Sequence, residues 1–481
     1  MSNSSIKNSA IKGMAWTGVE RLVCQAAQFV IGIIIARVLM PSDYGVIGML
    51  AIFLAIAQSI LDSGFANALI QKKERTNVDY CTVFYFNIAV SLLLYAVFFI
   101  SAPYIAEFYN MPILESVARV VSLSMIINGL TIVQTAKLTI DLNFKLQSII
   151  SITSTLASGG VGIALAYSGY GVWALVFQGL ASSTMRMLLL WSFSRWKPIL
   201  TFSYSSFKQL FSFGSKLLCS GLINTIYNNI YTLIIGKFFS AANVGLYNRG
   251  NQFVSLPTDT ITQTVLKVNY PILSNLQDDD EKLVATYRKL LRAPLFLLYP
   301  ILFGLAALAK PVVLVLLGEQ WLDCVPFIQI LSLGYMWSPL THINLNLLYV
   351  KGKSDKVLKL ELIKKPIAFI ILFATIPFGI WWMCAGRAIY FFIAFAMNCY
   401  YTKRLLNYGF TSQIKEVLPI IANVVVMFLA ITLSISLVDS ELAQLIVGIL
   451  VGIISFVGLS LLTKDSSFYE LLNIVKTRFK K

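Results

Sequence analysis

The chain has 481 residues, of which 57% are hydrophobic and only 12% are charged, and its formal net charge is +16. A soluble domain carries about 25% charged residues, so the composition excludes an ordinary soluble enzyme and indicates a membrane protein. Lys and Arg cluster between apolar runs, which assigns the positive charge to loops beside a membrane and not to a nucleic-acid surface.

Runs of about 20 mainly apolar residues, the length of one membrane-spanning helix, occur along the whole chain. The stretch from Leu146 to Met185 has no charged residue and is long enough for two such helices. The predicted fold class is an all-α polytopic membrane protein with about 14 transmembrane helices, of which those near Ala27 and Asp259 are the least apolar. The predicted centres, in chain order, are Ala27, Ala55, Ser91, Ile126, Thr155, Ala181, Ile226, Asp259, Phe303, Trp337, Phe369, Ala394, Met427 and Ile453.

The basic residues alternate with the predicted spans. With the N-terminus inside, 29 Lys and Arg fall in the inner connections and termini, against three near outer helix ends: Arg37, Lys237 and Lys310. Cytoplasmic loops carry such an excess of basic residues, and they favour an anionic inner leaflet. The pattern predicts a bacterial inner (cytoplasmic) membrane protein with both termini cytoplasmic.

An internal repeat lies at an offset of 200 residues. Residues 33–49 (IIIARVLMPSDYGVIGM) match residues 233–249 (LIIGKFFSAANVGLYNR), with Asp43 on Asn243 and Gly45 on Gly245. The match predicts two six-helix lobes with the same orientation in the membrane. Such lobes form a parallel repeat related by an axis along the membrane normal. We expect an N-lobe at 1–200, a C-lobe at 201–405, two further helices at 406–465 and a cytoplasmic tail at 466–481.

Polar residues inside the spans are the candidate binding residues, because they are costly in hydrocarbon and usually face a watery cavity. Three helices carry them at the i, i+4, i+7 spacing of one face. These stripes are Arg21, Gln25 and Gln28 in the first span; Asn224, Asn228 and Tyr231 in the seventh; and Asn248, Gln252, Ser255, Asp259 and Gln263 in the eighth, with Arg249 and Lys267 near its ends.

Isolated charges add to these stripes: Glu20, Asp62, Arg119, Arg186 and Arg387. The alternative interpretation is that such side chains snorkel or pair structurally, Glu20 with a neighbouring base and Arg387 with the outer headgroups. The set as a whole predicts a cationic cavity between the lobes with an anionic ligand. No catalytic or metal-binding motif occurs, so we expect no enzyme, no cofactor and no metal.

Four segments resemble the Wzx-type polysaccharide flippases, specifically the branch that includes colanic acid exporters, within the multidrug, oligosaccharidyl-lipid and polysaccharide exporter superfamily. These are ARVLMPSDYG, LDSGFANALIQ, VGLYNRGNQFVSLPTDTITQTVLKVNYPILSNLQDD, and LLGEQW followed by Pro326. The resemblance implies twelve core helices, two C-terminal helices, and a flippase that moves undecaprenyl-pyrophosphate-linked oligosaccharides to the outer leaflet. Related peptidoglycan-precursor flippases use arginines of helices one and eight, for which Arg21 and Arg249 are the nearest positions.

The interpretation is a monomeric alternating-access flippase for surface polysaccharide, such as capsule, exopolysaccharide or lipopolysaccharide. The substrate-binding residues are Arg21, Arg249, Arg119, Arg186, Lys267, Gln25, Gln28, Asn224, Asn228 and Gln252. A coupling proton or sodium ion is expected at Asp259, with Glu20 and Asp62 as the other candidates. The alternatives are a peptidoglycan-precursor or multidrug transporter of the same superfamily, or a membrane-embedded polysaccharide polymerase or transferase.

Overall fold

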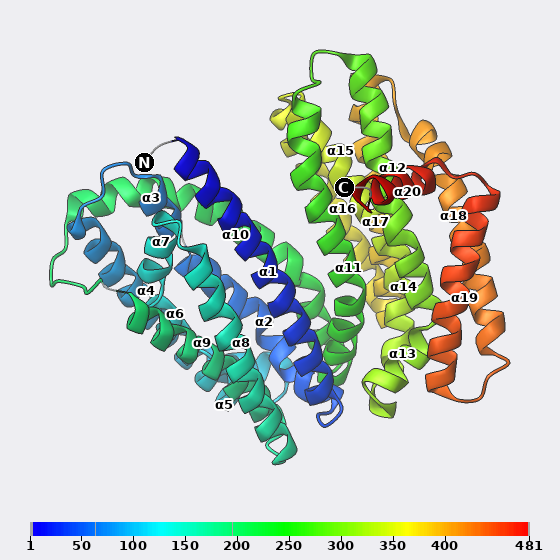
Figure 1. Cartoon of the computed structure of the whole chain (residues 1–481). Helices are drawn as coiled ribbons and strands as arrows, with labels where there is room; N and C mark the ends of the chain where they lie inside the picture. Colours follow the sequence, from blue (N-terminus) through cyan, green and yellow to red (C-terminus); the bar gives the residue numbers. More distant parts are fainter. Residues whose placement is uncertain (1–2, 63, 195, 480–481) are drawn as a thin grey trace. The chain divides into compact units, whose positions relative to one another are not determined.

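The computed structural model describes residues 3–62, 64–194 and 196–479. Within these ranges it consists of helices joined by short turns, with no β-strand, which confirms the all-α fold class. The chain divides into two compact units, residues 1–245 and 246–481, and the boundary falls inside the helix α11 (Ala241–Ser274) (Figure 1).

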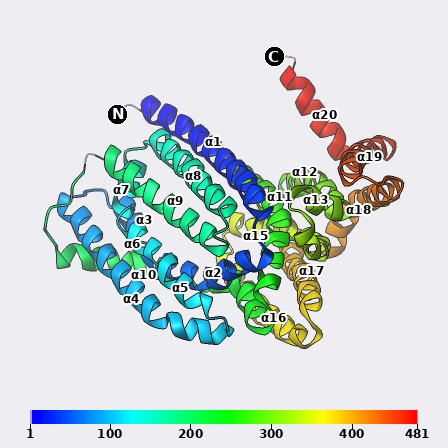
Figure 2. The ribbon, with the colours of Figure 1, turned by 90° about the horizontal axis from the view of Figure 1, so that it is seen from below.

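Unit 1 is a bundle in which α8 lies between α1 and α9, as both views show (Figures 1 and 2). A separate contact in this unit packs α10 against α2. Its helices are α1 (Asn3–Ala36), α2 (Pro41–Leu61), α3 (Phe65–Gln71), α4 (Asn77–Tyr109), α5 (Ile113–Val121), α6 (Leu123–Gly129), α7 (Ile132–Ile140), α8 (Phe144–Tyr167), α9 (Val172–Phe193), α10 (Tyr204–Phe238) and the first residues of α11.

Unit 2 holds the rest of α11 and the C-terminal helices. Within it α12 packs against α18, and α18 packs against α19. Its further helices are α12 (Asp280–Ala307), α13 (Ala309–Leu316), η1 (Glu319–Cys324), α14 (Val325–Tyr335), α15 (Ser338–Val350), α16 (Ser354–Thr375), η2 (Ile376–Phe378), α17 (Ile380–Leu406), α18 (Phe410–Ile435), α19 (Glu441–Leu462) and α20 (Ser466–Phe479). Figure 2 shows α20 extending away from the end of α19.

The predicted spans correspond to these helices. Thirteen of the fourteen predicted centres lie within a helix, and the remaining one, Trp337, lies in the two-residue turn between α14 and α15. In the described part of the chain, ten helical segments are long and apolar enough to cross a membrane. The segment at Ala27 is one of them and the segment at Asp259 is not, because its stripe of polar side chains lowers its hydropathy.

The two turns of the internal repeat are each closed by a hydrogen bond between the same two positions, 40 and 43 in the first copy and 240 and 243 in the second. The Asp43 carboxylate accepts a hydrogen bond from the Met40 backbone N–H at 3.0 Å and so caps the start of α2. At the matching place, the Ser240 hydroxyl accepts one from the Asn243 backbone N–H at 3.2 Å and caps the start of α11. A side-chain oxygen near the start of each helix thus satisfies a backbone donor in both copies.

The glycines of the repeat lie where the two helix starts cross. A Cβ atom on Gly45 would overlap the backbone of Ala241, and one on Gly245 would overlap the backbone of Pro41. The contact is reciprocal at the 200-residue offset, because Gly45 matches Gly245 and Pro41 matches Ala241. Only glycine allows backbones to approach this closely, which is the physical reason that both copies have it.

The fourth span of each repeat is broken. In the first copy, the breaks lie at Ser122, between α5 and α6, and at residues 130–131, between α6 and α7. In the second copy, Met336 and Trp337 separate α14 from α15, and the Trp337 ring stacks on Phe395 at a centroid distance of 5.6 Å.

Candidate functional site

The polar stripe of α1 lies beside the face of that helix that packs on α8. The Glu20 carboxylate accepts a hydrogen bond from the Ser148 hydroxyl of α8 at 3.0 Å, and one turn later Thr155 donates to the Cys24 sulfur at 3.8 Å. The stripe itself is open: Arg21 and Gln28 are exposed and Gln25 is half-buried. Glu20 therefore contributes to helix packing, whereas the stripe is available to a ligand.

Arg186 and Asp62 form the second polar group of unit 1. Asp62 follows the end of α2 and Arg186 lies on α9; both are exposed, and they are close enough to interact electrostatically. Gln58 donates to the Asp62 carboxylate at 3.0 Å and accepts a hydrogen bond from Asn128 at 3.2 Å. The structure thus adds Gln58 and Asn128 to the predicted residues.

The asparagines of α10 lie beside a contact with α2. The Thr225 and Ser59 hydroxyls are 2.8 Å apart, which fixes that side of α10 on α2. Asn224 and Asn228 are both exposed on α10. Their separation of one helical turn places them on one face, so they form an open pair of amide groups.

Arg249, in contrast, is buried within unit 2, with 6% of its surface exposed. Its Nη1 atom donates to the Gln252 side-chain oxygen at 2.9 Å, and its guanidinium lies 5.5 Å from the centre of the buried Trp321 ring. A cation over an aromatic face is stabilised where water is excluded. The structure therefore brings the predicted residues Arg249 and Gln252 into contact. It adds Trp321, which was not predicted, to this group.

Arg387 of α17 has protein partners on two other helices. It donates to the side chains of Tyr247, of Asn251 at 3.3 Å and of Tyr335 at 3.0 Å. The Tyr335 hydroxyl donates in turn to the Asn251 oxygen at 2.9 Å. Arg387 thus links α11, α14 and α17 through tyrosines and an asparagine, and the contact with outer headgroups named for it from the sequence stays a prediction.

The rest of the α11 stripe is more open. Asp259, Gln263 and Lys267 are exposed, and the Asp259 carboxylate acts electrostatically on the Tyr335 hydroxyl. Pro257, inside α11, lacks the backbone N–H that would continue the helix ladder. The stripe therefore places exposed polar groups beside a position where α11 lacks one backbone hydrogen bond.

Arg119 has partners close to it. It forms an ion pair of 2.9 Å with Glu115, one turn earlier on α5, and its guanidinium lies 4.5 Å from the centre of the Phe99 ring. These contacts give Arg119 a structural function in the described unit. Its predicted effect on a ligand stays a prediction, as do the roles of the other predicted residues.

Across residues 3–62, 64–194 and 196–479, no group of three His, Cys, Asp or Glu side chains is placed to hold a metal ion.

Comparison with known proteins identifies related sequences. Residues 34–326 match the family described as polysaccharide biosynthesis protein. The chain is 26% identical to the teichuronic acid biosynthesis protein TuaB of Bacillus subtilis, covering 73% of each chain. It is 24% identical to the succinoglycan biosynthesis transport protein ExoT of Rhizobium meliloti, over 97% of this chain and 96% of that one, and 24% identical to the lipopolysaccharide biosynthesis protein WzxC of Escherichia coli, over 75% and 74%.

The fold is also similar to that of solved transporters. An inward closed structure of the lipid II flippase MurJ matches with a TM-score of 0.74 at 14% identity, covering 95% of this chain and 99% of that one. An inward-facing multidrug transporter of the MATE family matches with a TM-score of 0.61 at 14% identity, over 82% and 99%. These matches show the fold and agree with the repeat-based architecture.

Proposed function

We propose, from the fact that this chain belongs to the family of polysaccharide biosynthesis proteins, that it is a flippase for undecaprenyl-pyrophosphate-linked oligosaccharide repeat units. The observation that carries the proposal is the exposed polar stripe Arg21, Gln25 and Gln28 on the membrane helix α1. An arginine facing hydrocarbon costs roughly 2.5 to 3.5 kcal/mol, so this stripe belongs beside a watery space that an anionic, hydroxyl-rich ligand can enter.

The chemistry of the exposed groups fits such a cargo. An arginine fork matches two phosphate oxygens at once, and the amides of Gln28, Asn224 and Asn228 can both donate to and accept from sugar hydroxyls. A pyrophosphate and a sugar cannot be solvated in hydrocarbon. Polar groups that replace water on one path through the bilayer remove that cost, while the lipid tail stays in the membrane.

The repeat supports alternating access as the mechanism, since two similar halves can rock about a fixed site. The protein would act as a monomer in the bacterial inner membrane, with both termini cytoplasmic and lobes at residues 1–200 and 201–405. This orientation rests on the excess of Lys and Arg in the connections on that side. The cargo would move from the inner to the outer leaflet for export of surface polysaccharide.

Energy coupling through Asp259 is part of the proposal. The membrane potential contributes about 2.3 kcal/mol per charge per 100 mV, which favours outward movement of a pyrophosphate unless the cationic site moves with it. A proton or sodium ion would then reset the carrier. Asp259 is the first choice, because its carboxylate is exposed on the polar stripe of α11 and it lies at the centre of the predicted eighth span.

The test is transport by the purified protein in proteoliposomes that contain a lipid-linked oligosaccharide. Flipping is measured as the fraction of sugar that becomes accessible to an added glycosidase, with protein-free vesicles as the control. We expect the accessible fraction to rise only with protein, and lipid II to compete poorly. Longer glycans on the same lipid would instead identify a polymerase, and uptake of a cationic dye without sugar movement would identify a multidrug transporter.

Coupling is tested in the same vesicles with pH and sodium gradients imposed separately. Asp259→Asn should abolish the response to the driving gradient and leave binding intact. Glu20→Gln, a matched loss of one carboxylate, should retain the response. An unchanged response in Asp259→Asn would show that the coupling ion binds elsewhere.

A further inference from the structure

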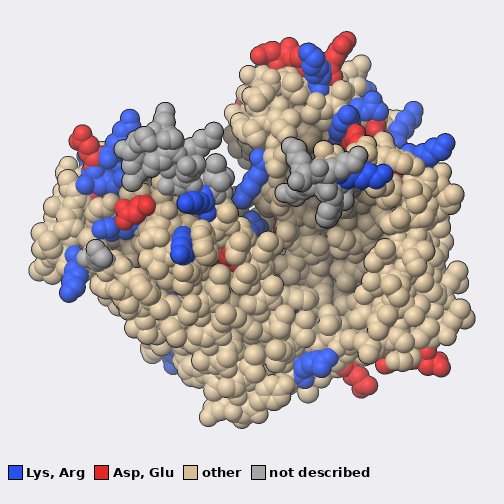
Figure 3. Space-filling view, viewed as in Figure 1, with Lys and Arg blue, Asp and Glu red and all other residues tan. Residues whose placement is uncertain are grey.

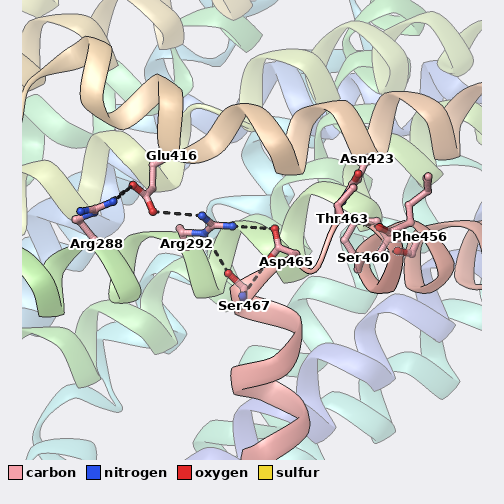
Figure 4. Close-up of polar contacts among 10 residues, drawn as sticks. Arg288, Arg292, Glu416, Asn423, Phe456, Ser460, Thr463, Asp465 and Ser467 are labelled. Atoms are coloured by element: carbon pink, nitrogen blue, oxygen red, sulfur yellow. Dashed lines mark hydrogen bonds and ion pairs between the residues drawn. The ribbon is translucent and has the colours of Figure 1, made fainter.

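The C-terminal unit contains an ion-pair network at one end of its helices (Figure 4). Arg292 of α12 donates to Glu416 of α18 at 3.2 Å, to Asp465 at 2.8 Å and to Ser467 of α20 at 3.3 Å. Arg288 donates to the same Glu416 carboxylate at 2.7 and 3.1 Å. The network therefore joins the middle of α12 to the first turns of α18 and to the start of α20.

Beside this network, α12, α13, α18 and α19 line an apolar groove of about 530 Å³. Figures 1 and 2 both place α18 and α19 beside α12 and α13, which form its walls. Its lining is carbon almost throughout, from Phe296 and Phe456 at the network end to Leu308 and Val312 at the other.

The length of the groove fits one lipid chain. Phe296 and Leu308 are twelve residues apart, which is about 18 Å along a helix. The hydrocarbon core of one leaflet is about 15 Å deep, half of the bilayer core. An acyl chain that enters from one leaflet therefore spans the groove from end to end.

The network end of the groove is basic. Lys289 is seven residues before Phe296, so it lies on the same face of α12, and its side chain is 69% exposed. Lys464 is exposed directly after the end of α19, and Lys415 is exposed on α18. Figure 3 shows Lys and Arg side chains around the end of this unit that carries α20.

We propose that this groove binds one acyl chain of an anionic membrane phospholipid, with the phosphate beside Lys289 and Lys464. Arg288 and Arg292 bind the largely buried Glu416 and Asp465, whereas Lys289 has only an exposed contact of 3.6 Å with Glu470, so the exposed lysines are the groups that attract the headgroup. The occupant is a resident membrane lipid distinct from the cargo, and it fills the space between α12 and α19. The site goes beyond the proposed flippase function and does not depend on it.

Two glycines provide a matched pair of variants. Gly304 of α12 lines the groove, and Gly458 of α19 does not. A Cβ atom added at either glycine would meet no atom within 4 Å. Gly304→Leu therefore adds a side chain on the groove wall from a Cβ position with open space around it, and Gly458→Leu makes the same change outside the groove. Any general effect of replacing a helical glycine is shared by both variants.

The measurement is native mass spectrometry of the purified full-length protein with added phosphatidylglycerol, phosphatidylcholine or undecaprenyl phosphate. Wild type and Gly458→Leu should retain phosphatidylglycerol equally, and Gly304→Leu should retain it about tenfold less, because the new side chain displaces buried methylenes. Lys289→Gln combined with Lys464→Asn should remove the preference for phosphatidylglycerol over phosphatidylcholine; asparagine suits position 464, where φ is +49°.

Equal retention by the two leucine variants would overturn the site. Displacement of phosphatidylglycerol from the groove by undecaprenyl phosphate would overturn the choice of a phospholipid. Because the readout is lipid retention and not sugar flipping, failure of this site leaves the proposed transport function unaffected, and failure of transport leaves the site testable.

Discussion

Arginines occur on the helices of both units, but their surroundings differ. On the α1 face, Arg21 is exposed and the adjacent Glu20 is hydrogen-bonded to α8; no ion pair to Arg21 forms within the described residues. On α12, Arg292 contacts two carboxylates from other elements. The comparison teaches that carboxylates separate the roles of these two arginines: Arg292, which contacts acids, holds helices together, and Arg21 is available to an anion from outside.

The largest effect is expected from breaking the network. Arg292→Ala leaves Glu416 and Asp465 largely buried without their shared partner, which should lower stability by about 3–5 kcal/mol. The measurement is thermal unfolding in detergent. The control Lys289→Ala loses only an exposed pair of 3.6 Å with Glu470 and should change stability by less than about 1 kcal/mol. Equal changes in both variants would refute a structural role for the network.

Arg21 should show the opposite profile. Arg21→Ala is expected to lower transport roughly 10- to 100-fold, the equivalent of one charged hydrogen bond of about 1.5–3 kcal/mol, with an unchanged unfolding temperature. Arg21→Lys should restore it only in part, because lysine lacks the planar fork. Leu22→Ala, also exposed on α1, is the control. Normal flipping by Arg21→Ala would place the anion site elsewhere.

Arg249 is buried against Trp321, as a structural arginine would be, yet it is the nearest position to a binding arginine of related flippases. Its variants therefore distinguish a structural role from substrate binding. Arg249→Lys should lower stability by about 1 kcal/mol, because a lysine makes a weaker contact with the ring. A transport loss larger than that of Trp321→Phe, measured in the same vesicles, assigns Arg249 to substrate binding. Parallel losses in both variants would make it a packing residue.

The smallest effect is expected at Arg119. Its ion pair with Glu115 is partly exposed and lies within one helix, so Arg119→Ala should cost about 0.3–0.5 kcal/mol. If the pair is only structural, Glu115→Ala gives the same small loss and both variants transport normally. A transport defect confined to Arg119→Ala would show that its charge acts on the cargo.

Much of the fold was predictable because hydropathy and repeat patterns are local. Apolar runs of about 20 residues located the spans, and the match of Gly45 with Gly245 located the two helix starts that cross in unit 1. Trp337 shows the limit of this reasoning: a hydropathy window places it at the centre of one span, whereas its ring packs on Phe395 in a break between two helices. Hydropathy records burial and does not record where a helix ends.

The candidate site was predictable as a set of stripes but not as contacts. The spacing of Arg21, Gln25 and Gln28 follows from helical geometry alone, and their exposure agrees with it. Asn128 and Gln58 are 70 residues apart, and Arg387 is 136 residues from Asn251. Spacing along one helix carries no information on such pairs, because they depend on which helices become neighbours.

The sequence by itself determined the membrane class, the approximate number of spans, the repeat and the residue types of a polar path, since each follows from composition or from a period within one helix. Only the tertiary structure decided which arginines contact carboxylates. Arg21 lies in the first predicted span and Arg292 in the basic connection before the ninth, and neither position specifies a partner. Helix packing places Glu20 beside Ser148 and places Glu416 and Asp465 beside Arg292. A buried charge is stable only with a partner, and the partner comes from a helix that the local sequence does not specify.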